Sequence, residues 1–494
     1  MISSPPVPAV TGVASCARPG RLLPTGVRPI RRVALIYSPI SPGTPLLSTV
    51  EKAQRRPGLG LRYLSAAFQA AGVQTVLFDN LYDSDAAARV HEPLNAGRFD
   101  LLCFHTTSAS RAVALATVAR LDPAWYAGRV LAGGPGSLHA AELLAGGVDV
   151  VAWGEGEEIA GQLVQAYQGE RPFGEVPGLR FVDEQGRTRD TGEPPIVDVA
   201  SLPRPDWSLH RPDYGDMFNI TMKRPYFVMM ASRGCPFRCA FCASHQVWKR
   251  RYRPRPVAAV LDELEWLWRE RGARYVHFLD DVFAWEPGWL DAFCDGVAAR
   301  GLRLDLSVVL HPLSFSGDQH RALGRLRTAG VRLVSFGAQS ADPRVLRGVG
   351  RSPEEPVALE RAVGIARELG MASVLTWIFG LPGDTEESIR ATTRWACRVR
   401  PTIADFHPLL YLPGSEIADS MDPARRCRLE DRTLNHLSFR ASADFYLRHG
   451  GLARLGAFVL RENPGWLRNL APVGRWGLEF LTLVRDRRST KHYL

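Results

Sequence analysis

Short apolar runs alternate with amphipathic stretches along most of the chain. In the first third, five apolar runs each end in polar residues, and a helical period of apolar positions begins at Leu59. This alternation, repeated about every 30 residues, predicts a doubly wound, flavodoxin-like α/β domain over residues 31–170. Such sheets bind ligands at the carboxyl ends of their strands. The five predicted strands are Val33–Tyr37, Val76–Phe78, Leu101–Phe104, Val130–Ala132 and Val148–Ala152.

A second series of apolar runs follows from Tyr226. Helical periods separate its members, at about 256–270, 287–299, 318–328, 355–369 and 385–397. Six strands with intervening helices predict a partial parallel (β/α)6 barrel, whose site would lie at the carboxyl ends of the strands. The six predicted strands are Tyr226–Met230, Tyr275–Leu279, Leu304–Val309, Leu333–Phe336, Ser373–Phe379 and Asp405–His407.

The remaining segments connect or flank these two series. Residues 1–30 are rich in proline and arginine, and no acidic residue precedes Glu51, so we expect a disordered N-terminal tail there. An Arg-rich transit peptide would share this composition, but the stretch lacks an amphipathic helical period. We expect a connecting region over 171–222, the barrel over 223–424 and a helical C-terminal region over 425–494.

Composition and charge narrow the class of protein. The chain has 494 residues, of which 46% are hydrophobic, and a net charge of +10 that favours anionic ligands without indicating nucleic acid. Eight cysteines are too sparse for a disulfide framework. No signal-peptide pattern opens the sequence and no apolar run is long enough for a transmembrane segment, so we expect a cytoplasmic protein.

Three of the cysteines form a compact cluster. Cys235, Cys239 and Cys242 follow the pattern C-x3-C-x2-C directly after the first strand of the second series. Thiolates favour iron–sulfur clusters and zinc. A structural zinc site needs four protein ligands, and here only His245 could complete one. The favoured interpretation is a [4Fe–4S] cluster whose fourth iron stays open for a small molecule.

This cluster, placed after a first barrel strand, resembles the radical S-adenosylmethionine (SAM) superfamily. The resemblance implies that the three cysteines hold the [4Fe–4S] cluster and that strand ends contact SAM. Many relatives have Glu where Gln339 stands, and a Gly-Gly-Glu end where Asp280 and Asp281 stand, which leaves the individual contacts open. The residues matched to SAM are Phe241, Asp280, Asp281, Gln339, Gly380 and Pro382.

The domain in front of the barrel resembles the cobalamin-binding (B12) class of these enzymes, the class B methylase-like family. Three segments carry that resemblance: the opening 57–64, the polar loops after the strands and the exit 202–207. The glycines allow a large planar cofactor to approach the backbone. The residues matched to cobalamin are Leu59, Thr106, Thr107, Ser108, Gly133, Gly134, Pro135, Gly154, Glu155 and Gly156.

One pattern of other cobalamin domains is missing. The sequence has no Asp-x-His-x-x-Gly motif, which supplies a histidine to cobalt in those domains. His105 follows a predicted strand but lacks that context, so we interpret it as a hydrogen-bonded loop histidine. The resemblance therefore implies cobalamin held without a protein histidine below the cobalt.

The activity implied by the resemblance is methylation of an unactivated carbon through a 5′-deoxyadenosyl radical and methylcobalamin. A small-molecule or peptide natural-product precursor would be the substrate, with a flavodoxin or ferredoxin as electron donor and no nucleic-acid partner. His407 and Tyr411, near the last strand end, are weak substrate-side candidates.

Four alternatives stay open at this point. The same domains serve cyclisation, rearrangement or oxidation without methyl transfer in some members of the class. The front domain could hold no cobalamin. An RNA-methylthiolating enzyme would need further cysteines in that domain, where only Cys16 and Cys103 occur. A cobalamin sensor would need no open iron.

Overall fold

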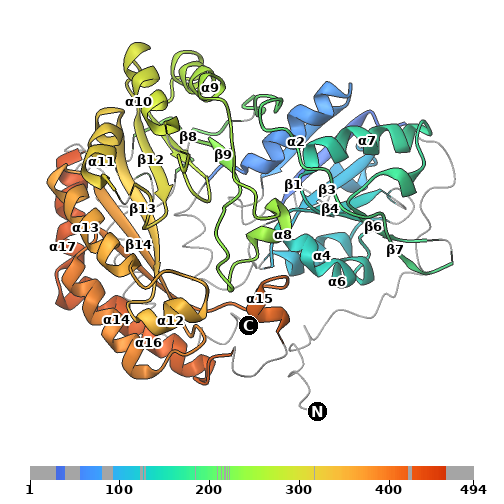
Figure 1. The fold of residues 1–494 in the computed structure, drawn as a ribbon. Coiled ribbons are helices and arrows are strands. Elements are labelled where there is room, and N and C mark those ends of the chain that lie inside the picture. Colours follow the sequence, from blue (N-terminus) through green and yellow to red (C-terminus); the bar gives the residue numbers. More distant parts are fainter. Residues whose placement is uncertain are drawn as a thin grey trace.

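The computed structural model describes residues 29–38, 56–79 and 93–462, apart from short gaps at 109, 123–125, 127–128, 184, 209, 213, 216–218, 220, 222, 287, 316 and 421–425. Nearly all of the predicted N-terminal tail and the last part of the predicted C-terminal helical region therefore lie outside the described residues. Two α/β units stand side by side in the rest (Figure 1). In the described part of the chain, no helix combines the length and apolarity needed to cross a membrane.

The first unit is built on a seven-stranded sheet in the order β2-β1-β3-β4-β5-β6-β7. Its first five strands are parallel and their order is that of a flavodoxin-like, doubly wound fold, as the sequence predicts. The strands are β1 (Arg32–Tyr37), β2 (Gln74–Asp79), β3 (Leu101–His105), β4 (Val130–Gly133), β5 (Val150–Ala152), β6 (Leu179–Val182) and β7 (Thr188–Asp190).

Helices cover both faces of this sheet (Figure 1). Alternate residues of β1 show why: Val33 and Leu35 pack into one apolar cluster, whereas Ala34 and Ile36 pack into another on the opposite face. A strand buried on both faces reads as a continuous apolar run. The helical segments are α2 (Leu59–Ala70), α4 (Arg111–Val118), η2 (Pro135–His139), α6 (Ala140–Ala145), α7 (Gly156–Gln168) and η3 (Phe173–Glu175).

The hairpin of β6 and β7 adds to this sheet. β6 pairs antiparallel with β5, so the sheet continues to Asp190, beyond the predicted domain end at residue 170. This pairing satisfies the backbone groups along the β5 edge that would otherwise lack partners.

The second unit is a six-stranded parallel sheet in the order β15-β14-β13-β12-β11-β8. Every strand pairs with its neighbour in the sequence, and β8 does not pair with β15, so the sheet is an open, partial (β/α)6 barrel as predicted. The strands are β8 (Tyr226–Met229), β11 (Tyr275–Phe278), β12 (Asp305–Leu310), β13 (Val331–Gln339), β14 (Ala372–Phe379) and β15 (Ile403–Pro408).

One face of this sheet carries the long helices. Phe336, Leu375 and Phe406 belong to the apolar core that these helices share. Trp395 lies 6.2 Å, between ring centroids, from Trp377. The helices are α9 (Val257–Glu270), α10 (Trp289–Ala299), α11 (Gln319–Thr328), α12 (Pro343–Gly348), α13 (Glu355–Glu368), α14 (Glu386–Val399) and α16 (Asp431–Ala443).

The opposite, inner face is closed near the strand starts by the C-terminal region. Beyond α16, the chain makes a π-helical turn, η5 (Asp444–Arg448), and enters α17 (Gly451–Glu462). Phe458 and Val459 of α17 pack against Val374 and Ile403. The described part of the predicted helical C-terminal region is therefore largely helical, and its α16 places Leu434 against the turn at Gly380, at the carboxyl end of β14.

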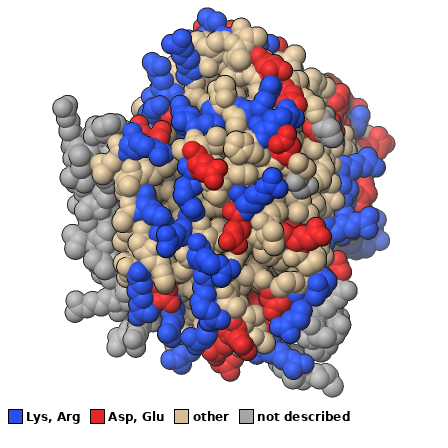
Figure 2. Space-filling view, turned by 60° about the vertical axis from the view of Figure 1, so that its left-hand side comes forward, with Lys and Arg blue, Asp and Glu red and all other residues tan. Residues whose placement is uncertain are grey.

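The surface of the helical layer carries both signs of charge. Figure 2 shows lysine and arginine interspersed with aspartate and glutamate over this face. Arg321 and Arg325 both pair with Asp291, and Arg325 also reaches Asp295. These two arginines of α11 are therefore paired with acidic side chains of α10.

Candidate functional site

The three clustered cysteines lie on one loop between two very short strands. β9 (Ser232–Arg233) pairs antiparallel with β10 (Arg253–Pro254), and the loop 234–252 runs between them, with α8 (Ser244–Trp248) inside it. All three thiols are free and partly exposed. Gly234 starts the loop at a φ of +87°, and a Cβ there would lie 2.0 Å from the Arg251 carbonyl oxygen. Only glycine allows the two ends of the loop to approach so closely.

Loops that follow the barrel strands support this cysteine loop. The Ala240 N–H donates to the Val349 carbonyl at 3.0 Å, and its own carbonyl accepts from Ile417 at 3.1 Å. Ile417 lies in α15 (Glu416–Asp419), after the last strand. Phe237 stacks on His311, which follows β12, with ring centroids 3.5 Å apart. The cysteines therefore sit at the carboxyl end of the open barrel.

Burial and one arginine set the charge state of the cysteines. Burial raises the pKa of Cys235 to about 12, and it also raises the pKa of Cys239. Arg351 opposes the effect at Cys239, because its NH1 lies 3.7 Å from that sulfur. The thiols of Cys235 and Cys239 are therefore protonated at neutral pH without metal, and iron binding would release those protons.

Zinc is the weaker interpretation of the same loop. His245 Nδ1 lies 2.9 Å from the Cys242 carbonyl oxygen, and its Nε2 lies 3.2 Å from Gln246 Nε2, so both ring nitrogens have protein partners. No three histidine, cysteine or acidic side chains of the described residues converge closely enough for a single metal ion. Cysteines that each bind a different iron of a cluster need not converge on one point.

The two aspartates after β11 have different surroundings. Asp280 is buried and accepts from the Ala231 N–H at 3.0 Å and from the Ser232 hydroxyl, so its carboxylate supports the chain that leads into the cysteine loop. Burial raises its pKa to about 7. Asp281 is exposed to solvent and lies near Cys235, and desolvation by the surrounding protein raises its pKa to about 6. Of the pair, Asp281 is the one whose side chain is accessible to a ligand.

Gln339 ends β13 in an unusual conformation. Its φ is +59°, the β13–β14 pairing shifts register beside it, and its side chain is buried. Its Oε1 atom is buried and has no hydrogen-bond partner within the described part of the chain. Buried polar atoms are normally satisfied, so an unpartnered oxygen at a strand end fits a site that receives a polar ligand.

The glycine turn after β14 is held by an acidic side chain. Asp384 Oδ2 accepts from the N–H groups of Gly380 and Leu381, both at 3.0 Å, and its Oδ1 accepts from Ser388. Pro382 is buried within that turn. Phe241 packs near Ile378 of the same strand, so the cysteine loop and the glycine turn share one apolar cluster.

The front-domain residues matched to cobalamin lie at the carboxyl edge of the first sheet. Hydrogen bonds join the loops after β3 and β4. Thr106 Oγ1 donates to the Gly133 carbonyl at 3.0 Å, and Ser108 Oγ lies 3.1 Å from His139 Nε2. The Thr107 hydroxyl pairs with Ser110. A Cβ on Gly134 would lie 2.9 Å from the His105 ring, so that glycine allows close packing of the two loops.

Two buried polar atoms at this edge have no partner among the described residues: His105 Nδ1 and Trp153 Nε1. His105 stacks on Tyr37 with ring centroids 4.8 Å apart, and burial lowers its pKa to about 4, so it is neutral near pH 7. One ring nitrogen of His105 thus lacks the hydrogen bond that we expected for this residue. An unsatisfied edge of this kind fits a site for a polar ligand.

Two of the residues matched to cobalamin, Leu59 and Glu155, are buried and have other contacts. Leu59 packs in an apolar core, and Glu155 forms ion pairs. Leu59 is buried in the core that joins the two units, near Trp207 and Phe227. Gly154 and Gly156 flank Glu155 at the start of α7, and the Glu155 carboxylate pairs with two arginines of the barrel unit. The carboxyl edge of the first sheet thus faces the cysteine loop.

The substrate-side candidates lie on and after β15. Asp405 and His407 occupy the same inner face as Ile403, opposite the helical layer, and His407 Nε2 lies 2.7 Å from Asp405 Oδ2. The bond to Asp405 raises the pKa of His407. The Tyr411 hydroxyl accepts from the Cys427 N–H at 3.2 Å and belongs to the loop beyond the strand.

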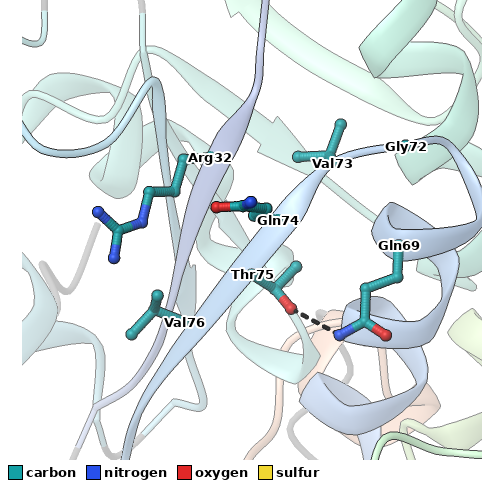
Figure 3. A pocket seen from close by; sticks show the side chains of 7 residues that line it. All are labelled: Arg32, Gln69, Gly72, Val73, Gln74, Thr75 and Val76. Carbon is teal, nitrogen blue, oxygen red and sulfur yellow. Dashed lines mark hydrogen bonds between the residues drawn. The ribbon is translucent and has the colours of Figure 1, made fainter.

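A separate hollow lies away from this site. It is open, has a volume of about 490 Å³ and lies along the edge strand β2, where Gln69 and Thr75 are hydrogen-bonded (Figure 3). Its lining residues are Arg32, Gln69, Gly72, Val73, Gln74, Thr75 and Val76. None of the predicted site residues lines it.

Sequence reasoning missed three arginines that the structure brings to the cysteine loop: Arg233, Arg253 and Arg351. Arg233 and Arg253 bracket the loop in the sequence, and Arg253 belongs to a basic run at 250–255. Arg351 lies more than a hundred residues from the cysteines, and no local signal marks it.

Comparison with known proteins identifies one domain. Residues 229–396, about a third of the chain, match the model of the radical SAM superfamily. The match spans β8 to α14, and it includes all three cysteines and every residue matched to SAM.

Relatives extend the similarity into the front domain. An anaerobic magnesium-protoporphyrin IX monomethyl ester cyclase of Cereibacter sphaeroides is 28% identical over 372 residues, which is 72% of this chain and 58% of the relative. An uncharacterized methyltransferase of Pyrococcus horikoshii is 29% identical over 271 residues, which is 55% of this chain and 57% of the relative. The chain thus spans a little over half the length of these two relatives.

Solved structures share the two-unit fold. The methyltransferase TsrM from Kitasatospora setae, solved with cobalamin and a [4Fe–4S] cluster, has a TM-score of 0.62 at 20% identity over 79% of this chain and 74% of its own. The cobalamin-dependent enzyme OxsB, solved with aqua-cobalamin, has a TM-score of 0.60 at 16% identity over 79% of this chain and 55% of its own. At these identities the likeness shows the fold.

Proposed function

We propose that this chain is a cobalamin-dependent radical SAM enzyme that methylates an unactivated carbon of a small-molecule or peptide natural-product precursor. One observation carries the proposal: the carboxyl edge of the doubly wound sheet faces the loop that holds Cys235, Cys239 and Cys242. Each parallel sheet presents its ligand-binding edge to the other. Two cofactors and a substrate between them would therefore lie within one enclosed region.

The residues on each side fit these cofactors. Three free cysteines on one loop suit a cluster with an open iron. The unpartnered Gln339 oxygen and the exposed carboxylate of Asp281 suit the polar groups of SAM. The unpartnered His105 and Trp153 nitrogens suit the polar periphery of cobalamin. When bound, the cluster would supply the electron that cleaves SAM and cobalamin would carry the transferred methyl group.

The chain itself would bind and orient these groups. Asp280 holds the entry of the cysteine loop, Asp384 holds the glycine turn, and the aromatic and apolar side chains around Phe237 and Phe241 exclude water. A dry, fixed environment protects reactive carbon radicals from side reactions. A flavodoxin or ferredoxin donor and a cytoplasmic location remain predictions.

The names of several relatives support methyl transfer. They include a tryptophan 2-C-methyltransferase of Streptomyces laurentii and a hopanoid C-3 methylase of Methylococcus capsulatus. The second candidate is a cyclase or other oxidative enzyme without methyl transfer. It is favoured by the cyclases of Cereibacter sphaeroides and Rubrivivax gelatinosus, which match 72% and 74% of this chain.

The first test is anaerobic purification with cobalamin supplied, followed by quantitation of iron, sulfide and cobalamin. We expect about four irons and one cobalamin per chain, and no cluster in Cys239→Ala. Cys427→Ala is the matched control and should keep its iron. Iron without cobalamin would reject the methylcobalamin proposal.

The second test separates methyl transfer from cyclisation before a substrate is known. The holoenzyme, a reductant and SAM with a labelled methyl group are incubated together. A methylase should produce S-adenosylhomocysteine and labelled cobalamin, whereas a cyclase should produce only 5′-deoxyadenosine. Absence of label in cobalamin would favour the second candidate.

A further inference from the structure

The cysteine loop is closed at its base by two arginines that face each other. Arg233 and Arg253 are register partners in the antiparallel pair of β9 and β10, and the whole loop 234–252 lies between them. Like charges directly opposite each other in such a pair are destabilising. The pair is also only two residues long on each strand, so its backbone hydrogen bonds alone hold the base weakly.

Both arginines converge on one carboxylate of the front domain. Glu155 Oε1 lies 2.6 Å from Arg233 NH1, and Glu155 Oε2 lies 2.8 Å from Arg253 NH1. The same Oε2 accepts from the Val197 N–H at 3.1 Å, while Arg253 donates to the Val197 carbonyl at 2.6 Å. Glu155 therefore bridges the two ends of the cysteine loop and the segment that connects the two units.

This bridge is buried. The side chains of Glu155 and Arg233 are 2% and 5% exposed. A second carboxylate, Glu157, pairs with Arg233 only, at 2.5 Å. The Arg233 guanidinium also lies over the rings of Tyr63 and Trp248, at 5.1 and 5.8 Å from their centroids. In such a dry setting each charge depends strongly on its partner, and loss of one partner leaves the other uncompensated.

We propose that Glu155 is a positioning residue for the cysteine loop, and that it holds both ends of this loop together against the front sheet. It neutralises the repulsion between Arg233 and Arg253, which Glu157 cannot do because it reaches only one of them. The assignment of a cluster to this loop rests on the proposed function, whereas the closure of the loop by Glu155 does not. The position of the three sulfurs thus depends on a residue of the other unit.

The test compares hydrogen–deuterium exchange in the full chain without iron. The variant is Glu155→Gln, which keeps size and removes charge, and the matched control is Glu158→Gln, which makes the same change at an exposed position of the same helix. We expect exchange over residues 234–252 to become several-fold faster in Glu155→Gln, because local opening costs less when the base is no longer held. Exchange in Glu158→Gln should match the wild type.

A double variant removes the repulsion together with the bridge. In the double variant Glu155→Gln/Arg253→Gln the base carries one positive charge instead of two, so we expect slower exchange over 234–252 than in Glu155→Gln alone. If Glu155→Gln fails to fold, Glu155→Asp, which keeps the charge with a shorter reach, should still exchange faster over 234–252 than the wild type, and an unchanged rate there would also overturn the proposal. Unchanged exchange in Glu155→Gln, or faster exchange in the double variant than in the single one, would overturn the proposal.

A spectroscopic measurement tests the consequence for the cluster. After reconstitution, the electron paramagnetic resonance spectrum of the reduced protein is recorded with and without SAM. We expect an altered line shape and a smaller SAM-induced change in Glu155→Gln, and a wild-type spectrum in Glu158→Gln. If wild-type protein takes up no iron but Glu155→Gln still loosens the loop, the proposed function fails and the positioning role stands. If wild-type protein takes up iron and Glu155→Gln alters neither exchange nor spectrum, the positioning role fails alone.

Discussion

Arg351 places its guanidinium NH1 3.7 Å from the sulfur of Cys239, although the two residues lie far apart in the sequence. The same guanidinium pairs with Glu355 at 2.5 Å and donates to the Gly337 carbonyl at 2.8 Å. A fixed positive charge beside a cluster ligand stabilises the more negative, reduced state of the cluster. Arg351 would therefore tune the proposed cluster as well as shape its surroundings.

Replacing this charge should change the reduction potential. We expect Arg351→Gln to lower the midpoint potential of the reconstituted cluster by tens of millivolts, because the cation that favours the reduced state is gone. A redox titration monitored by electron paramagnetic resonance measures the shift. Arg347→Gln, at an exposed position in α12, is the control and should leave the potential unchanged. Equal potentials in all three proteins would contradict the role assigned to Arg351.

Gly234 offers a steric test of the loop base. In Gly234→Ala the new methyl group would lie 2.0 Å from the Arg251 carbonyl oxygen, so the loop cannot close as in the wild type and iron uptake should fall severalfold. Gly288→Ala is a matched control, since Gly288 has a similar φ of +80° and nothing within 4 Å of the added methyl group. The control carries the backbone strain alone, about 1 kcal/mol, and should retain its iron. Iron-to-protein ratios after reconstitution measure both, and similar losses would show that strain, not the contact, is responsible.

Gln339 should affect SAM binding without affecting the cluster. Its unpartnered Oε1 lies at the strand end where SAM is expected, so Gln339→Ala should weaken SAM binding by about tenfold, the value of one hydrogen bond. Isothermal titration of the cluster-loaded protein with SAM measures this change. Iron content serves as the internal control. Wild-type affinity in the variant would remove Gln339 from the SAM site.

The pair of Asp405 and His407 predicts a pH dependence. The bond to Asp405 raises the pKa of His407, so its stabilising contribution is present below the unfolded-state pKa and is lost as the pH rises through the folded-state value. Asp405→Asn should lower the pKa of His407. Histidine C2 hydrogen exchange followed by mass spectrometry reports the pKa of that one residue. Asp431→Asn, on α16, should leave it unchanged, and an unchanged His407 in Asp405→Asn would mean that the pair does not persist in solution.

The sequence alone determined the order of elements and the chemistry of the cysteine loop. A strand that is buried on both faces appears in the sequence as a continuous apolar run. Each parallel strand of both sheets could therefore be predicted from its own residues. The spacing of Cys235, Cys239 and Cys242 is also local, and it indicated soft-metal chemistry without any tertiary information. The glycine turn at Gly380 was visible for the same reason, since its holding residue, Asp384, lies four positions away.

Only the tertiary structure decided how the two units meet and which charges surround the cysteines. Glu155 looked like part of a cofactor loop, yet its carboxylate lies between Arg233 and Arg253 of the other unit. Asp280 looked like a SAM contact, yet both of its oxygens accept from the chain before the cysteines. No pattern in the sequence marked Arg351 as a neighbour of the cysteines. A sequence pattern records which residues share a strand or helix, but the partner of a buried charge is set by the packing of elements that are distant in the chain.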